Sequence, residues 1–292
     1  MKTILISGAN GFLGSYLCNY FCKKNNYTVI GLIRSSSETH RIEQLKSSIH
    51  LYEIDKVDID FIFNKHKINI IINTVCNYGR KNSNYEELFN SNFLFGKNLI
   101  DIAISFNVDL FINTDTLLPE NLNSYSETKT LFRKHIRSLD SKLKIINLRI
   151  DHMYGPGDDT NKFIPWLINQ IRNTTNEIEL TSGDQLRDFI YIDDVVSAFY
   201  NVVVASSKLN SYTEYDLITD QSVKMKKIIL LISEKISSVD NKSNLSRLNF
   251  GAKEYRKNEV MTTTYTGNSL NSIAWKPRFS LDYGISKILN KK

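Results

Sequence analysis

A tyrosine and a lysine four residues apart could together deliver a proton to a carbonyl oxygen. Tyr125 and Lys129 would share one face of a helix. A free phenol has a pKa near ~10, poorly matched to neutral pH, and a nearby ammonium lowers it. Ser124 and Glu127 form a capping-box pattern, so we expect the helix to begin at Tyr125 and to hold the phenol in its first turn. The spacing predicts a general acid.

A threonine at the end of the preceding apolar run completes the predicted catalytic set. Thr114 stands eleven residues before Tyr125, and its hydroxyl could bind and orient the carbonyl oxygen. The alternative is a hydroxyl that caps the strand end. In a reduction, Tyr125 would protonate the ketone oxygen while a nicotinamide cofactor delivers hydride, and Lys129 would also hold the nicotinamide ribose.

A glycine-rich turn predicts where that cofactor binds. The segment Gly8–Gly14 separates the first apolar run from the first helical stretch. Glycines at such a turn allow backbone to approach a pyrophosphate, and the following helix N-terminus offers free N–H groups. The residues we expect to bind cofactor here are Gly8, Asn10, Gly11, Phe12, Leu13 and Gly14.

The end of the second predicted strand favours NADPH over NADH. NAD-binding sheets usually carry an acidic residue there for the ribose 2′-hydroxyl, but Leu32–Ser36 contains none. Arg34 could pair with a 2′-phosphate and Ser35 could donate to it; alternatively, Arg34 is a surface residue. Asp55 is expected either to bind the adenine amino group or to cap its strand. Thr74, at the fourth strand, is also counted as cofactor-binding.

Strand-like and helical segments alternate through the first half of the chain. β-branched, wholly apolar runs separated by helices predict a doubly wound parallel α/β sheet with right-handed crossovers. The expected strands are Thr3–Ser7, Thr28–Ile33, Ile49–Glu53, Ile68–Val75, Val108–Thr114 and Leu143–Leu148. The expected helices are Phe12–Lys24, Asp58–Lys67, Tyr85–Phe106 and Tyr125–Leu139.

This alternation breaks down after Leu148. We expect a strand at Phe189–Ile192 and a helix at Asp193–Ala205 to return to the main sheet, with further helices near Met225–Ile236 and Leu281–Leu289. The predicted division is an NADP-binding Rossmann domain of residues 1–150 plus about 186–206, and a smaller substrate lobe of residues 151–185 and 207–292.

Composition restricts the classes of partner. Hydrophobic residues make up 41% of the chain and charged residues 23%, as in ordinary globular proteins. The net charge of +6 is scattered, which argues against a nucleic-acid partner. No apolar run is long enough for a membrane span, and the start does not resemble a signal peptide. Cys18, Cys22 and Cys76 are interpreted as reduced thiols without bound metal. We therefore expect a cytoplasmic protein.

Two further motifs carry a family resemblance. Arg149 with Tyr154–Asp158 resembles an R-x-x-x-x-Y-G-P-G loop, and Gln185–Val195 resembles an R-D-F-x-x-V-x-D-V segment. With the glycine turn and the Tyr125–Lys129 pair, these motifs resemble the nucleotide-sugar branch of the extended short-chain dehydrogenase/reductase family. The similarity is greatest to 4-keto reductases of CDP-linked sugars.

The resemblance implies an enzyme that uses NADPH to reduce the C4 ketone of a nucleotide-linked 4-keto-deoxyhexose, with CDP favoured, in deoxysugar and surface polysaccharide biosynthesis. It also implies a homodimer and two arginines, Arg187 and Arg256, that meet the substrate diphosphate. Guanidinium groups match phosphate charge and geometry. Arg187 could alternatively pair with Asp188 or Asp193, and Arg256 could face solvent.

Other activities of the same family remain as alternatives. Asp115-Thr116 stands where 4,6-dehydratases have Asp-Glu, so the glutamate base of a dehydratase is missing. An epimerase would share Thr114 and the Tyr125–Lys129 pair, but epimerases usually retain NAD, which conflicts with Arg34. A non-catalytic NADPH-binding sensor is the third hypothesis.

Overall fold

An eight-stranded parallel sheet forms the centre of the first part of the chain. The structure is a computed structural model and describes residues 1–80, 83–240 and 245–290. Within these residues the strand order is β14-β11-β6-β5-β4-β1-β2-β3. The strands are β1 (Lys2–Ser7), β2 (Tyr27–Ile33), β3 (His50–Glu53), β4 (Ile70–Asn73), β5 (Leu110–Thr116), β6 (Lys144–Ile150), β11 (Tyr212–Leu217) and β14 (Asn268–Ser269).

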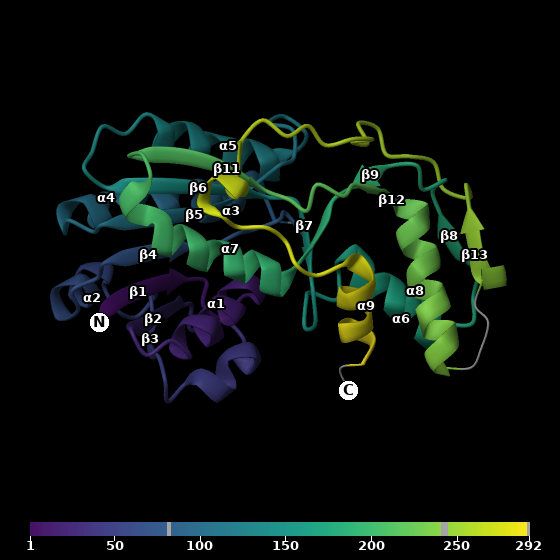
Figure 1. Cartoon of the computed structure of the whole chain (residues 1–292), viewed down its shortest axis with the longest axis horizontal. Helices are drawn as coiled ribbons and strands as arrows, with labels where there is room; N and C mark the ends of the chain where they lie inside the picture. The colour runs from purple at the N-terminus through teal and green to yellow at the C-terminus, as the bar shows by residue number, and fades with distance from the viewer. Residues whose placement is uncertain (81–82, 241–244, 291–292) are drawn as a thin grey trace. The chain divides into compact units, whose positions relative to one another are not determined.

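Helices cover both faces of this sheet (Figure 1). They are α1 (Phe12–Cys22), α2 (Ile59–Lys65), α3 (Tyr85–Phe89), α4 (Phe95–Ser105), α5 (Ser124–Arg137) and α7 (Ile192–Ala205). Helices α2, α4 and α5 pack on one face. On the other face α1 meets α7, where the rings of Tyr20 and Tyr200 lie 5.4 Å apart. The predicted doubly wound Rossmann sheet is confirmed.

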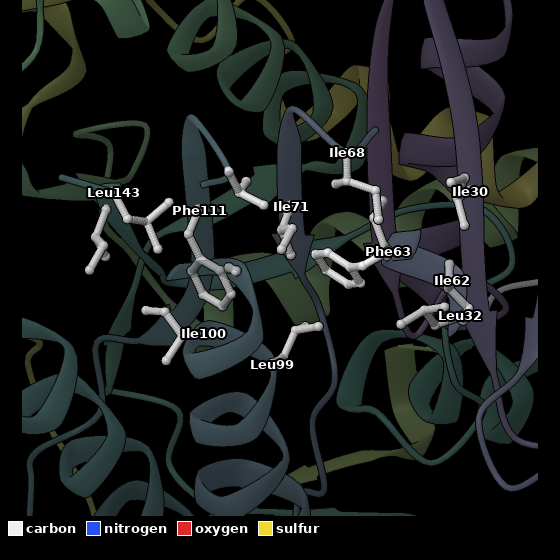
Figure 2. Close-up of a cluster of buried hydrophobic side chains, with 14 of the residues drawn as sticks. Ile30, Leu32, Ile62, Phe63, Ile68, Ile71, Leu99, Ile100, Phe111 and Leu143 are labelled. Carbon is white, nitrogen blue, oxygen red and sulfur yellow. The ribbon is translucent and has the colours of Figure 1, made fainter. Parts of the chain in front are cut away.

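The core lies between the sheet and the helices α2 and α4. Figure 2 shows Ile71 of β4 and Phe111 of β5 directed toward Leu99 and Ile100 of α4, with Phe63 of α2 beside them. Fully burying such a side chain contributes roughly 1.5–3 kcal/mol. This packing fixes the strand ends from which the candidate site is built.

The predicted helix Tyr85–Phe106 contains a π-helical turn. This turn, η2 (Asn90–Leu94), lies between α3 and α4. It carries the buried Asn92, whose side-chain amide donates to the carbonyl of Asn77 (2.9 Å) and to the hydroxyl of Thr128 on α5 (3.0 Å). Such turns are frequent at functional sites, and this one ties the segment after β4 to α5.

The chain divides into two compact units. The first comprises Met1–Ile150, Val196–Leu217 and Thr266–Trp275, and the second Asp151–Val195, Ile218–Tyr265 and Lys276–Lys292.

The expectation that Phe189–Ile192 is a strand of the main sheet is wrong. This segment forms β10 (Phe189–Tyr191), which pairs with β7 (His152–Tyr154) in the second unit. The position beside β6 is taken by β11, in parallel register from Tyr212↔Ile145 to Leu217↔Ile150. Their pairing is reinforced by the buried ion pair of Arg149 with Asp216.

The second unit contains short strands and three helices among its described residues. The strands are β7, β8 (Ile178–Leu180), β9 (Leu186–Arg187), β10, β12 (Val223–Lys224) and β13 (Leu248–Phe250). The helices are α6 (Phe163–Asn173), α8 (Met225–Asp240) and α9 (Leu281–Leu289). Short 3₁₀ turns in the two units are η1 (His40–Leu45), η3 (Ser206–Lys208), η4 (Leu245–Arg247) and η5 (Leu270–Ile273). In the described part of the chain, every helix is too short or too polar to cross a membrane.

Candidate active site

The glycine turn after β1 is built as a phosphate-binding loop requires. Gly8 has a φ of +70°, which favours glycine, and the amide of Gly11 donates to its carbonyl at 2.9 Å. A Cβ on Gly14 would lie 2.1 Å from the Gly8 carbonyl oxygen, so only glycine lets α1 start against the turn. Helix α1 begins at Phe12 with no side-chain cap, and the N-terminal end of a helix favours an anion.

Two contacts brace this loop from neighbouring strands. The Thr74 hydroxyl donates to the Ser7 carbonyl at 2.6 Å, which fixes the end of β4 against the end of β1. The Asn10 side chain donates to the carbonyl of Glu38 at 2.8 Å. The phosphate loop and the segment after β2 are thereby joined. The Asn10–Glu38 bond had no sequence signal, because it connects two loops.

Predicted cofactor residues beyond β2 pair with each other. The backbone N–H of Ser35 donates to Asp55 at 2.8 Å, and its hydroxyl bonds to the same carboxylate. These hydrogen bonds hold the pKa of Asp55 below its usual range. Asp55 therefore shapes the loop that presents Arg34, whose side chain is exposed. Roles for Arg34 and Ser35 at a 2′-phosphate, and for Asp55 at adenine, stay predictions.

Helix α5, which carries Tyr125 and Lys129, begins one residue earlier than the capping pattern indicated. Asn123, rather than Ser124, is the N-cap: its side chain accepts from the Ser126 amide at 2.9 Å, and the Ser126 hydroxyl accepts in turn from the Asn123 amide. Asparagine competes well with serine at this position. Tyr125 still lies in the first turn of α5.

The structure brings Lys129 of α5 to the end of β5. Its buried ammonium donates to the carbonyl of Thr114 at 2.6 Å. The Thr114 hydroxyl oxygen is buried and has no hydrogen-bond partner among the described residues. A buried hydroxyl without a partner is costly, so a ligand oxygen that met it would be bound favourably. This observation fits the predicted carbonyl-binding role.

The phenol of Tyr125 is shielded on one side by Tyr78, whose ring centroid lies 5.2 Å away. Burial raises the pKa of Tyr125 well above its ordinary value, and nearby Cys76 and Tyr78 add to this, while a hydrogen bond with the Thr116 side chain opposes it. The expectation that the Lys129 ammonium lowers this pKa is therefore wrong for the chain without cofactor, where burial dominates. The phenol is protonated at neutral pH, as a proton donor must be.

The second unit holds the two predicted diphosphate-binding arginines. Arg187 donates to Glu259 at 2.8 Å and to the Leu186 carbonyl at 2.8 Å. Its ionic partner is thus Glu259, and not Asp188 or Asp193 as the structural alternative had it. Arg256 has an exposed side chain, and its carbonyl accepts from the Glu259 amide at 2.9 Å.

Glu259 therefore connects the two segments that carry the arginines. The Asp188 carboxylate instead accepts from the amide and hydroxyl of Thr219, both at 2.8 Å, and from the amide of Gln221. A separate polar hollow of about 290 Å³ in this unit includes Trp166, Glu179 and Lys253 in its lining, but neither arginine.

The three cysteines are free thiols. Cys18 is fully buried, and burial raises the pKa of its thiol. Cys22 and Cys76 are half-buried. In the described part of the chain, no group of three or more His, Cys, Asp or Glu side chains could hold a metal ion.

The chain is similar to known proteins along its whole length. The chain is 29% identical to the CDP-abequose synthase of Salmonella typhimurium over 99% of its own length and 97% of that protein. It is 25% identical to the dTDP-4-dehydro-6-deoxyglucose reductase of Escherichia coli, over 98% and 96% of the two chains.

Solved structures share the fold. UDP-glucuronic acid 4-epimerase of Bacillus cereus, in complex with a fluorinated UDP-sugar and NAD, superposes with a TM-score of 0.81 at 20% identity, covering 99% of this chain and all of that one. UDP-glucose 4-epimerase of Thermotoga maritima gives 0.79 at 21% identity, covering 98% and 96%. Residues 4–217, from the first strand to the end of β11, match the NAD dependent epimerase/dehydratase family, and the chain belongs to this family.

Proposed function

We propose that this protein is an NADPH-dependent reductase of the C4 ketone of a nucleotide-linked 4-keto-deoxyhexose, with CDP as the favoured nucleotide. The observation that carries the proposal is the unpartnered Thr114 hydroxyl, at the strand end held by Lys129 and near the first turn of α5, where Tyr125 lies. Similarity to CDP-abequose synthase along the whole chain supports the choice of substrate.

The glycine turn, α1 and Thr74 would hold the dinucleotide, which supplies hydride when bound. Gly8 and Gly14 allow the tight turn and the close packing of α1 against it, because a Cβ at either position would contact Thr74 or the backbone of the turn. Arg34, exposed after β2, would pair with the 2′-phosphate.

Protein groups then act on the ketone oxygen. The Thr114 hydroxyl donates to this oxygen and orients it. Tyr125 transfers its proton to the same oxygen as negative charge develops there. Lys129 holds the end of β5 through the Thr114 carbonyl, and its positive charge favours the phenolate left behind.

The surroundings of β5 favour reduction over dehydration. Thr116 cannot serve as the carboxylate base of a 4,6-dehydratase. Asp115 is buried, and its carboxylate accepts hydrogen bonds from Arg133 at 2.6 Å and Asn147 at 2.8 Å. An ion-paired, buried carboxylate is poorly suited to proton transfer with a substrate.

Arg187 and Arg256 are proposed to bind the substrate diphosphate. Arg187 is already oriented by Glu259, so it would exchange or share that partner when phosphate binds. We also expect a cytoplasmic protein. We expect it to be a homodimer, which sedimentation of the purified chain would test.

Turnover of defined keto sugars tests the function. The purified chain is supplied with NADPH or NADH and with CDP-, GDP- or dTDP-linked 4-keto-deoxyhexoses, and the C4 configuration of the product is determined by NMR. We expect one NADPH oxidised for each sugar reduced, fastest with a CDP sugar. Epimerisation without net NADPH consumption would indicate an epimerase, and binding of NADPH without any turnover would indicate a sensor.

A further inference from the structure

A row of buried polar side chains crosses the sheet directly beneath the candidate site. Ser7, Asn73, Asn113 and Asn147 lie in register on β1, β4, β5 and β6. Their side chains are bonded in sequence: Ser7 to Asn73 at 2.7 Å, Asn73 to Asn113 at 3.2 Å, and Asn113 to Asn147 at 2.8 Å. All four are buried. We call these four residues the amide row.

The amide row ends on a buried ion pair. The Asn147 amide donates to Oδ2 of Asp115 at 2.8 Å, and Nε of Arg133 donates to the same oxygen at 2.6 Å. The other oxygen of Asp115 accepts from the Thr116 backbone amide at 2.7 Å, and Arg133 donates to the Thr116 carbonyl at 3.0 Å. The pair therefore fixes both backbone polar groups of Thr116.

The charge of Asp115 sets the direction of every bond in the amide row. An ionised carboxylate only accepts, so Asn147 must present its NH₂ group to it. The Asn147 carbonyl then faces Asn113, which must donate in turn, and the same logic continues to the Ser7 hydroxyl. The donors and acceptors of the row follow this order throughout. Loss of the carboxylate would leave donors facing donors at this end.

Predicted site residues lie next to this network, both along the strands and on α5. Gly8, Thr74 and Thr114 directly follow Ser7, Asn73 and Asn113 in the chain. Arg133 stands four residues beyond Lys129 and eight beyond Tyr125, on one face of α5.

We propose that Asp115 and Arg133 are positioning residues that hold the end of β5 against α5, so that Thr114, Tyr125 and Lys129 keep the geometry needed for proton transfer. The inference rests on the proposed function for its kinetic consequence. Its geometric consequence, the contact between the Lys129 ammonium and the Thr114 carbonyl at 2.6 Å, is independent of any activity.

The test uses D115N, R133Q and the double variant D115N/R133Q. K46Q is the control, because Lys46 is exposed and pairs at the surface with Glu43 at 2.7 Å. Lys134 would be a poor control, since its partner Glu120 also lies 3.7 Å from Arg133. Four quantities are measured in the full chain. They are kcat per mole of bound NADPH, which corrects for any unfolded fraction, NADPH affinity, thermal stability, and the ¹⁵N–¹H signal of the Lys129 ammonium, assigned by its loss in K129M.

We expect each single variant to lose about ten- to a hundredfold in kcat per bound NADPH, the scale of a small misplacement of reacting groups. NADPH affinity should stay within about twofold, and the Lys129 signal should shift or vanish through faster proton exchange. K46Q should match the wild type in kcat, in NADPH affinity and in the Lys129 signal.

The double variant separates positioning from folding. Each single variant leaves one buried charge without its partner and should therefore be less stable than the wild type. The double variant has neither charge, so its thermal stability should exceed that of the single variants. The amide introduced by D115N would still present an NH₂ group to a donor, so kcat and the Lys129 signal should stay impaired. Recovery of kcat together with stability would overturn the proposal, as would an unchanged Lys129 signal in folded D115N and R133Q. If the wild type reduces no keto sugar, the proposed function fails, and the Lys129 signal alone decides the positioning role.

Discussion

The polar and charged groups of the candidate site have different partners in the two units. In the first, Lys129 is buried on the Thr114 carbonyl, Asp115 is paired with Arg133, and one site hydroxyl, that of Thr114, is left without a partner among the described residues. In the second, Arg187 is paired with Glu259 and Arg256 is exposed.

This difference suggests a division of roles. The first unit is arranged before substrate arrives, so changes there should act on kcat or on cofactor affinity. To bind substrate, Arg187 would have to share or exchange its partner Glu259, and Arg256 would have to give up its contact with solvent, so changes there should act on KM.

The largest effect is expected from Y125F. Removing the proton donor should lower kcat by at least about a hundredfold, with NADPH affinity nearly unchanged because the hydroxyl serves the transition state. Steady-state kinetics and NADPH titration measure the two. Y85F is the control, because Tyr85 is an exposed residue of α3 whose hydroxyl donates to Glu127 of α5 at 3.0 Å. Near-wild-type turnover in Y125F would eliminate this residue as the acid.

The R34A variant should weaken NADPH binding about ten- to a hundredfold and NADH binding little. A charge-assisted contact with the 2′-phosphate is worth roughly 1.5–3 kcal/mol. Fluorescence titration with both cofactors measures this, with K46A, which removes an exposed lysine paired to Glu43, as control. Equal losses for the two cofactors, or a wild-type preference for NADH, would show that Arg34 is a surface residue.

R187A and R256A should raise KM for the nucleotide sugar while leaving NADPH affinity unchanged. We expect the larger increase, about tenfold or more, for the partly buried Arg187. The comparison variant is R247A, because Arg247 donates to the carbonyls of Ile171 and Asn176 around the end of α6 and should affect stability without changing KM. Early melting of R187A with unchanged KM would place Arg187 in the same structural class.

The smallest effect concerns stability at alkaline pH. Burial raises the pKa of Tyr125 in the folded chain. Its stabilising contribution is complete below the unfolded pKa near ~10 and is lost as pH rises toward the folded pKa, by about 1.4 kcal/mol per pH unit. Denaturant unfolding between pH 10 and about 11 should therefore show a shallower pH slope for Y125F than for the wild type. A residual slope should remain, because burial also raises the pKa of Tyr154, Tyr212 and Tyr265. Identical slopes would mean that the Tyr125 phenol is solvated.

Local sequence was sufficient wherever a feature depends on neighbouring residues. The alternation of apolar runs and helices predicted the Rossmann sheet, because a strand buried on both faces must be apolar throughout. Gly8 and Gly14 were identifiable because the turn tolerates no Cβ. The four-residue spacing of Tyr125 and Lys129 placed both on α5.

Features that depend on contacts between distant segments appeared only in the tertiary structure. One example is strand pairing: β10 pairs with β7, and β11 pairs with β6. The sequences of these short strands do not indicate which strand lies beside which. Glu259 lies 72 residues from its partner Arg187, and the bonds of the amide row join residues 34 to 66 positions apart. In the sequence these side chains are ordinary polar residues next to apolar ones. Only burial, where each polar group must find a partner, determines which of them meet.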